Sequence, residues 1–239
     1  MVRQSLEQAR KWGLVARSPA VEATPPGQRR HEISPPTVDQ VRTLLEAARE
    51  EDPDFGTYLW LVAATGCRRG EACAIRWSDV DLGRGEIAIR RSIAMAGSTP
   101  YEKDTNTRQA RRVALDEATV GVLRDHRRRL RERSLALGTH LADDAHLFAD
   151  PAGRPWRPDV CTNQFCRLRD RLQFAGVRLH DLRHFVATAL GAGGTPRATI
   201  SDRLGHRDKA TTLNMYSHAL PANDQIAAAY LGKLLTGAS

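Results

Sequence analysis

The stretch RLHDLRHFVATAL at 178–190 holds several side chains that can do chemistry. His180, Arg183 and His184 lie within five residues and precede an apolar run, a pattern typical of the start of a helix. Two kinds of site would use them. His180 and His184 are spaced as in a metal-binding H-E-x-x-H helix, with Asp181 in place of glutamate. His180 and Arg183 are three residues apart, share a helix face and would hold one phosphate group.

The charge balance of the chain favours an anionic partner. There are 36 lysines and arginines against 28 acidic residues, which gives a formal net charge of +8. Only four of the basic residues are lysines, so 32 are arginines. A guanidinium binds phosphate through a planar, bidentate fork, and the excess therefore favours a nucleic-acid partner. Arginine-rich codon usage in the source genome is the alternative origin of the same bias.

The remaining composition is that of an ordinary globular protein. The 239 residues are 41% hydrophobic and 27% charged, enough for one large domain or one domain with an appendage. No apolar run approaches the ~20 residues that span a bilayer, and the N-terminus lacks the apolar core of a signal peptide, so we expect a cytoplasmic protein. The cysteines fit no structural zinc spacing and are expected in the core: Cys67, Cys73, Cys161 and Cys166.

The elements that would position these side chains are mostly helices. Thr37 and Gln40 form a capping-box pattern ahead of an apolar stripe. Gly66 is a natural end for a second helix over 55–65, and a short third helix is expected from about Arg68. Further helices are predicted at about 117–135, 157–174, 180–191, 196–204, 208–218 and 222–235.

Between Val80 and Leu115 the pattern changes to that of strands. The segment VDLGRGEIAIRRSIAM alternates apolar and polar residues around a glycine-containing turn, and RRVALD supplies another short strand. The polar, turn-rich AGSTPYEKDTNTRQ lies between them. These patterns predict a small antiparallel sheet with one long hairpin. The expected fold class is therefore α+β, mainly helical.

Three further motifs accompany the opening stretch, in the order found in one enzyme family. They are an arginine after a T-G-x turn, an L-G-H turn and a tyrosine about ten residues beyond it. In this chain the motifs place Arg68 in TGCR, His180 and Arg183 in HDLR, His206 in LGH and Tyr216 in NMYSH. Over residues 34–220 the sequence therefore resembles the catalytic domain of the tyrosine recombinase (phage integrase) family.

The resemblance implies site-specific DNA recombination without a metal or cofactor. Tyr216 would attack a DNA phosphodiester and form a covalent 3′-phosphotyrosyl intermediate, which preserves the bond energy for rejoining. Arg68 and Arg183 would hold the two non-bridging oxygens, where negative charge develops. His180 would act as general acid/base, and His206 would hydrogen-bond the phosphate. The metal interpretation leaves Arg68, Arg183 and Tyr216 without a role.

One family feature is displaced in this chain. The family places a lysine in the β-hairpin, just before a threonine, where it protonates the leaving 5′-oxygen. In EKDTNTRQARRVAL the aligned residue is Asn106, before Thr107, and asparagine cannot donate a proton as an acid. Lys103 stands three residues earlier and has a long stem, so it is the candidate acid; the open alternative is that it is solvated and the acid is missing. Glu71, one turn after Arg68, is expected to orient that guanidinium.

The resemblance also implies a division of the chain and a set of partners. Residues 1–20 resemble the last helix of a core-binding domain, 21–33 a linker and 34–239 the catalytic domain. A short helix ending near Arg17 and a proline-rich stretch without an apolar period fit this division. The implied partners are double-stranded DNA, a homotetramer on that DNA and accessory DNA-bending proteins.

Two questions stay open at the level of sequence. The helix at 222–235 would pack either on a neighbouring protomer or on its own domain. Its apolar residues in helical spacing are Ile226, Ala229, Tyr230 and Leu234. The alternative function is a non-catalytic or impaired DNA-binding protein that uses 196–218 as a helix-turn-helix. The two functions differ in whether Tyr216 reacts.

Overall fold

The computed structural model describes residues 2–21, 35–104, 110–205 and 220–237. The chain divides into two compact units, 1–33 and 34–239. The first unit contains α1 (Val2–Lys11) and a 3₁₀ turn (Pro19–Val21). The helix predicted to reach Arg17 ends earlier, at Lys11, because the chain turns at Gly13 through a left-handed φ of +71°. Within the described ranges, no helix is long and apolar enough to cross a membrane.

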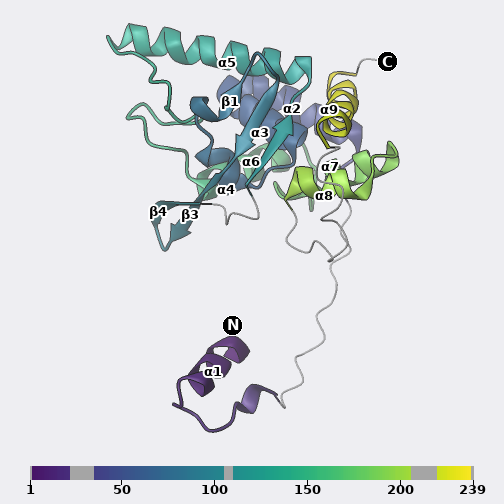
Figure 1. Ribbon diagram of the computed structural model, residues 1–239. Helices are drawn as coiled ribbons and strands as arrows, with labels where there is room; N and C mark the ends of the chain where they lie inside the picture. The colour runs from purple at the N-terminus through teal and green to yellow at the C-terminus, as the bar shows by residue number, and fades with distance from the viewer. Residues whose placement is uncertain (1, 22–34, 105–109, 206–219, 238–239) are drawn as a thin grey trace. The chain divides into compact units, whose positions relative to one another are not determined.

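The larger unit is mainly helical, and its helices surround α3 (Pro53–Thr65) (Figure 1). Their bounds are α2 Val38–Glu51, α4 Arg69–Ala74, α5 Glu117–Ala136, α6 Pro158–Arg171, α7 Asp181–Ala192, α8 Arg197–Leu204 and α9 Leu220–Thr236. α3 is buried on nearly all sides because α2, α5, α7 and α9 pack against it. The helix predicted at 208–218 lies outside the described residues.

Local signals set the start of α2 and the burial of the cysteines. Thr37 Oγ1 accepts a hydrogen bond from the Gln40 amide, and Gln40 Oε1 accepts one from the Thr37 amide, so the capping box is confirmed. The apolar stripe of α2 is buried through Val41, Leu44, Leu45 and Ala48. Of the four free cysteines, three are buried and Cys166 is half-buried, as expected for small core residues.

The short strands form two separate antiparallel groups rather than the single sheet predicted. β2 (Glu86–Ile89) pairs with β1 (Val80–Asp81) on one side and with β5 (Arg111–Ala114) on the other. β3 (Arg91–Ala96) and β4 (Thr99–Asp104) form the predicted long hairpin, which projects from the body of the unit (Figure 1). The split lies at Arg90, since β2 before it pairs with β5 and β3 after it pairs with β4. The observed class is α+β and mainly helical, as predicted.

α9 packs on its own unit through a face that overlaps the predicted apolar stripe only at Tyr230 and Leu234. The buried residues are Ala227, Ala228, Leu231 and Leu235, whereas Ile226 is 67% exposed. Ala229 is also exposed, and Tyr230 and Leu234 are partly buried. The packed stripe contains small residues because the neighbouring chain comes very close. A Cβ on Gly232 would lie 2.0 Å from Asp116 Oδ2.

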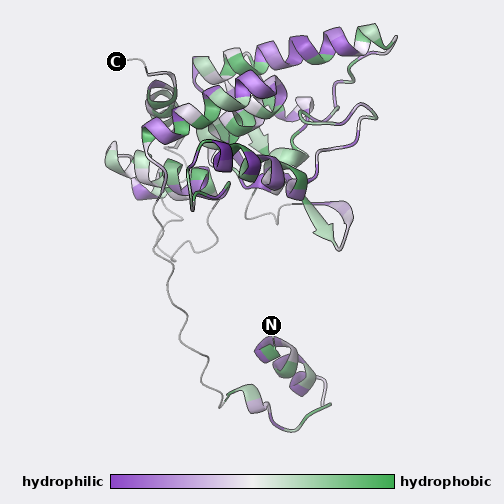
Figure 2. Cartoon of the chain, turned by 180° about the vertical axis from the view of Figure 1, so that it is seen from behind, coloured by the Kyte–Doolittle hydropathy of each residue, from purple (hydrophilic) through white to green (hydrophobic). Residues whose placement is uncertain are grey.

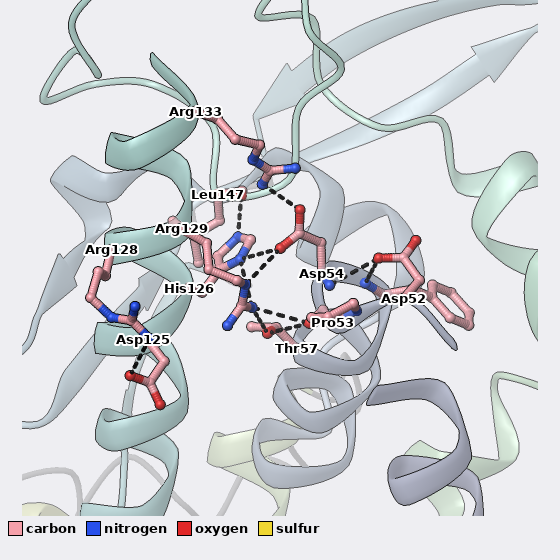
Figure 3. A network of polar contacts seen from close by, with 11 residues as sticks. Asp52, Pro53, Asp54, Thr57, Asp125, His126, Arg128, Arg129, Arg133 and Leu147 are labelled. Atoms are coloured by element: carbon pink, nitrogen blue, oxygen red, sulfur yellow. Dashed lines mark hydrogen bonds and ion pairs between the residues drawn. The ribbon is translucent and has the colours of Figure 1, made fainter. Parts of the chain in front are cut away.

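A polar cluster joins the start of α3 to α5, which is a largely hydrophilic helix (Figures 2 and 3). Asp54 accepts a hydrogen bond from Arg129 Nε at 3.3 Å and pairs with Arg133. Its Oδ1 lies 3.1 Å from Nδ1 of the buried His126. Burial raises the pKa of Asp54, but the hydrogen bond and charge of His126 and the guanidinium of Arg133 outweigh it, so the pKa lies well below its ordinary value. Part of the arginine-rich face of α5 therefore holds α3.

Candidate active site

The turn between α3 and α4 positions Arg68. α3 ends at Gly66, which has a left-handed φ of 67°, and Arg68 is the N-cap residue of α4. Glycine is required here for a second reason, since a Cβ on Gly66 would lie 2.3 Å from Leu204 Cδ2 at the end of α8. The TGCR motif therefore brings the last turn of α8 close to Arg68.

Arg68 is held by a buried carboxylate. Glu71 is 2% exposed and accepts hydrogen bonds from the Arg68 amide at 2.9 Å and from Arg68 Nη1 at 2.7 Å. The Nη2 of Arg68 donates to the carbonyl oxygen of Gly205 at 3.2 Å. The contact expected between Glu71 and Arg68 is present, and it fixes both the backbone and the guanidinium of the arginine.

Arg183 is a buried guanidinium with an unused donor. It lies on α7, is 4% exposed and donates from Nη1 to the Gly66 carbonyl oxygen at 2.7 Å. Its Nη2 is buried and has no hydrogen-bond partner among the described residues. Burial, and then the charges of Arg68 and Arg111, lower the pKa of Arg183 to about 10. An anion beside Nη2 would relieve both the missing hydrogen bond and the charge repulsion.

His180 stands at the start of α7, on the wall of a cavity of about 460 Å³ that Arg68 also lines. Its ring lies edge-on against the ring of His184, with 5.0 Å between the centroids. Partial burial, followed by the charges of His184 and Arg183, lowers the pKa of His180. The imidazole is therefore mostly neutral at neutral pH and able to accept a proton.

The aspartate of the HDLRH stretch serves the turn before α7. Asp181 is buried and accepts hydrogen bonds from the Arg178 amide at 2.8 Å, from Nε at 3.2 Å and from Nη2 at 2.9 Å. It is thus committed to the turn rather than free to act as the base of an H-E-x-x-H site. In the part of the chain that the structure describes, no three His, Cys, Asp or Glu side chains are grouped to hold a metal ion.

The order of the motifs and the fold around them have a counterpart in a known family. The sequence matches the model of the phage integrase family over residues 37–223, which is well over half of the chain. The chain belongs to the phage integrase family. A similar integrase-family protein is the tyrosine recombinase XerC-like protein of Caldanaerobacter subterraneus subsp. tengcongensis, 25% identical, with 87% of this chain and 58% of that protein covered.

Two further integrases show the same partial coverage. The ICEBs1 integrase of Bacillus subtilis is 29% identical, with 76% of this chain and 49% of that protein covered. The putative prophage phiRv2 integrase of Mycobacterium tuberculosis is 28% identical, with 87% of this chain and 53% of that protein covered. The chain therefore spans about half of the length of these relatives.

Solved integrases share this fold. The Tn1549 transposon integrase in complex with transposon right end DNA has a TM-score of 0.71 at 17% identity, with 99% of this chain and 76% of that chain covered. The integrase from mycobacterium phage Brujita has a TM-score of 0.60 at 18% identity, with 98% of this chain and 69% of that chain covered. At these identities the likeness concerns the fold, and it confirms the predicted α+β class.

The integrase fold brings part of the predicted site together. Arg183 donates to Gly66, two residues before Arg68, and His180 and Arg68 line one cavity. Three positions singled out in the sequence lie outside the described residues: Asn106, His206 and Tyr216. The structure does describe the approach to His206, because Gly205, directly before it, accepts the hydrogen bond from Arg68.

The β3–β4 hairpin of this member of the phage integrase family carries Lys103 on the side that faces α4. Lys103 lies opposite Ser92 in the antiparallel pairing, so the two side chains leave the same face of the hairpin. Ser92 faces α4, because its Oγ lies 2.8 Å from where a Cβ on Gly70 would stand. Lys103 itself is exposed. The partner strand β3 is the one that packs against α4, the helix that begins directly after Arg68.

Sequence reasoning missed Arg111, which lies behind Arg68. Its Nη2 donates to Glu71 Oε2 at 2.8 Å, and its Nε donates to the Arg203 carbonyl oxygen at 2.7 Å. The available signal was the RRVAL strand, since alternation along a strand turns only one of two adjacent arginines inward. The side chain of Arg111 is 7% exposed and that of Arg112 is 64% exposed. Arg111 shares its face of the strand with the buried Val113 and Leu115, so the alternation within the motif already indicates which arginine points inward.

Proposed function

We propose that this chain is the catalytic part of a site-specific DNA recombinase that cleaves and rejoins DNA through a 3′-phosphotyrosyl intermediate. Membership of the phage integrase family supports the reaction class. The observation that carries the proposal is Nη2 of Arg183, a buried donor without a described partner, close to the charge of Arg68. A buried donor is costly to leave unpaired, and a non-bridging oxygen of a DNA phosphate supplies the missing acceptor.

The proposed chemistry assigns one task to each side chain. The Tyr216 hydroxyl loses its proton to a base and attacks phosphorus, the bond to the 5′-oxygen breaks, and the leaving oxygen takes up a proton. Arg68 and Arg183 stabilise the charge on the non-bridging oxygens of the pentavalent state. His180, held neutral, is the proposed general acid/base, and His206 hydrogen-bonds the phosphate. The two guanidiniums supply the charge neutralisation for which other phosphoryl-transfer enzymes use metal ions.

Lys103 is the proposed acid for the leaving 5′-oxygen. Its position opposite Ser92, on the face of the hairpin toward α4, supports this assignment. Asn106, at the position aligned with the family lysine, has no acidic proton to give. The side chain of Lys103 has a flexible four-carbon stem, so it can reach the leaving oxygen although it stands three residues before the position of the family lysine.

The proposed substrate is double-stranded DNA, and the Tn1549 integrase solved on transposon right end DNA supports this choice. Further proposals rest on the family resemblance. They are a homotetramer on DNA, accessory DNA-bending proteins, a cytoplasmic location, the last helix of a core-binding domain at 1–20 and a linker at 21–33. The chain spans about half of the length of its relatives, so these proposals concern the whole protein.

A covalent trap tests this function without knowledge of the DNA site. The probe is a library of nicked duplexes with randomised bases around the nick, so that cleavage releases a short strand and rejoining is blocked. At low salt and high protein concentration, which strengthen phosphate binding, we expect a detergent-resistant protein–DNA adduct that excess chelator does not reduce. Tyr216→Phe should form none. No adduct with the unaltered protein, or an adduct that persists in Tyr216→Phe, contradicts the proposal, and loss in chelator would favour metal chemistry.

A further inference from the structure

Arg111 on β5 connects two parts of the proposed site. Its guanidinium donates from Nη2 to Glu71 Oε2 at 2.8 Å and lies 3.4 Å from Glu71 Oε1 through Nη1. On its other side, Nε donates to the Arg203 carbonyl oxygen at 2.7 Å, in the last turn of α8. One nearly buried side chain therefore touches both the carboxylate that holds Arg68 and the end of α8.

The shared carboxylate explains why a second arginine is present. Burial raises the pKa of Glu71, but the hydrogen bond and charge of Arg111, and then the hydrogen bonds from Arg68, outweigh it, so the pKa lies below its ordinary value. Two guanidiniums around one ionised carboxylate leave a net positive charge. Without Arg111, Glu71 would pair with Arg68 alone and neutralise it. Arg111 thus leaves the charge of Arg68 available for an anion.

The contacts of the two arginines also fix the end of α8. Arg111 holds the carbonyl of Arg203, and Arg68 holds the carbonyl of Gly205. Gly205 has a left-handed φ of 67°, and a Cβ there would lie 2.8 Å from Arg111 Nη1, so glycine makes room for this arginine. The chain enters 206–219 directly after this point, and that range contains the proposed phosphate ligand and nucleophile.

We propose that Arg111 is a positioning residue for strand cleavage. It orients Arg68 through Glu71 and fixes the last turn of α8, from which the chain leads to His206 and Tyr216. It touches no substrate atom in this scheme. The inference rests on the proposed function, because it assumes that Arg68 acts on a DNA phosphate.

The test compares Arg111→Ala with Arg112→Ala, since the two arginines are neighbours on β5 and only the first faces the site. DNA sequences recovered from the trap of the unaltered protein serve as the substrate, and the single-turnover rate of adduct formation is measured at saturating DNA. We expect Arg111→Ala to slow cleavage by about 10²-fold, the scale of a misplaced catalytic group, and Arg112→Ala to change it by less than about threefold. Arg111→Lys, which keeps the charge but reaches only one of the two acceptors, should recover about tenfold of the loss.

A double-mutant cycle separates positioning from a general loss of structure. If Arg111 acts through Arg68, Arg111→Ala should slow an Arg68→Lys protein by less than about threefold, because the oriented guanidinium is already gone. If Arg111→Ala slows adduct formation by the same factor in the Arg68→Lys protein as in the unaltered protein, the two residues act independently and the inference is overturned. Equal rates for Arg111→Ala and Arg112→Ala would also overturn it. If Arg111→Ala does not fold by circular dichroism, the same cycle is run with Arg111→Lys. Absence of any adduct with the unaltered protein would instead remove the proposed function, and the inference with it.

Discussion

Among the candidate site residues, the two arginines and the lysine differ in what holds them. Arg68 is fixed by Glu71, and Arg183 is fixed by the carbonyl of Gly66. Lys103 lies on β4, whose six residues are all exposed. The arginines are therefore preorganised for an anion, which is how a charged group contributes most to a transition state. In the proposed function, an acid on an exposed hairpin must instead be brought to the leaving oxygen when the hairpin meets the DNA.

The proposed acid role of Lys103 predicts a dependence on the leaving group. Lys103→Ala should slow cleavage of normal DNA by about 10²–10⁴-fold, the usual effect of losing a general acid. A substrate with a 5′-phosphorothiolate at the scissile position should be slowed much less, because a leaving sulfur needs no proton. The single-turnover rates of adduct formation on the two substrates provide the measurement.

Two other outcomes would argue against an acid role for Lys103. Equal slowing on both substrates would remove Lys103 from the acid role. If Asn106→Lys accelerates cleavage of normal DNA while Lys103→Ala has no effect, the acid is missing from this chain and the enzyme is impaired.

At the scale of elements, the contact between α3 and α5 depends on one ionised carboxylate. Asp54 carries a lowered pKa because His126 and Arg133 outweigh its burial (Figure 3). A carboxyl group whose pKa is lower in the folded state stabilises the fold above its unfolded pKa, about 4 for aspartate. This stabilisation is lost as the pH falls below that value toward the folded pKa. The α3–α5 contact should therefore weaken in acid.

Asp54→Asn tests this dependence. We expect the substitution to lower the free energy of unfolding at about pH 7 by roughly 1–3 kcal/mol, a range reduced because Arg129 and Arg133 stay partly in water. The difference from the unaltered protein should shrink at about pH 3.5, where the unfolded aspartate is largely protonated. Urea unfolding at both pH values measures it. Asp125→Asn is the control, since Asp125 pairs with Arg128 at 3.5 Å on the exposed side of α5. A pH-independent difference for Asp54→Asn would contradict the argument.

For the whole molecule, α9 closes the larger unit. It packs against α2, α3, α5, α7, α8 and β5, which come from all parts of the unit. Asp224 adds polar contacts, because its carboxylate accepts from Arg203 Nη1 at 2.6 Å and from the Ala114 amide at 2.5 Å. Removing α9 would expose the core of the unit. A deletion after Pro221 would therefore report on folding. To test whether α9 also contacts a neighbouring protomer, a change is needed that leaves this core intact.

Point substitutions on α9 separate its packed face from its exposed face. Leu231→Ala should lower the free energy of unfolding by about 2–4 kcal/mol, because Leu231 is buried and the change leaves a cavity. Ile226→Ala should change it by less than about 0.5 kcal/mol, because Ile226 is exposed. Urea unfolding of both variants provides the comparison. If Ile226→Ala instead lowers synapsis of DNA complexes without changing stability, the exposed face serves a neighbouring protomer.

The sequence by itself determined what depends on local order. The capping box at Thr37 and the stop at Gly66 act within one turn of helix, so the start of α2 and the end of α3 were predictable. The spacing of Arg68, His180 and Arg183 is likewise written in the chain, and the family follows from the order of such motifs. The contact of Glu71 with Arg68 spans one helical turn and was expected for the same reason.

The tertiary structure decided what depends on neighbours distant in the chain. Alternation along β5 places Arg111 on the same face as the buried Val113, but only the return of α8 beside β5 supplies its acceptor on Arg203. On α9, helical spacing alone does not show that Ile226 is exposed while Leu231 is buried, because this depends on how closely the helix approaches Asp116 at Gly232. That Nη2 of Arg183 has no acceptor among the described residues becomes visible only when α7 is buried against Gly66. Burial and register are set by packing between elements, and no local pattern contains them.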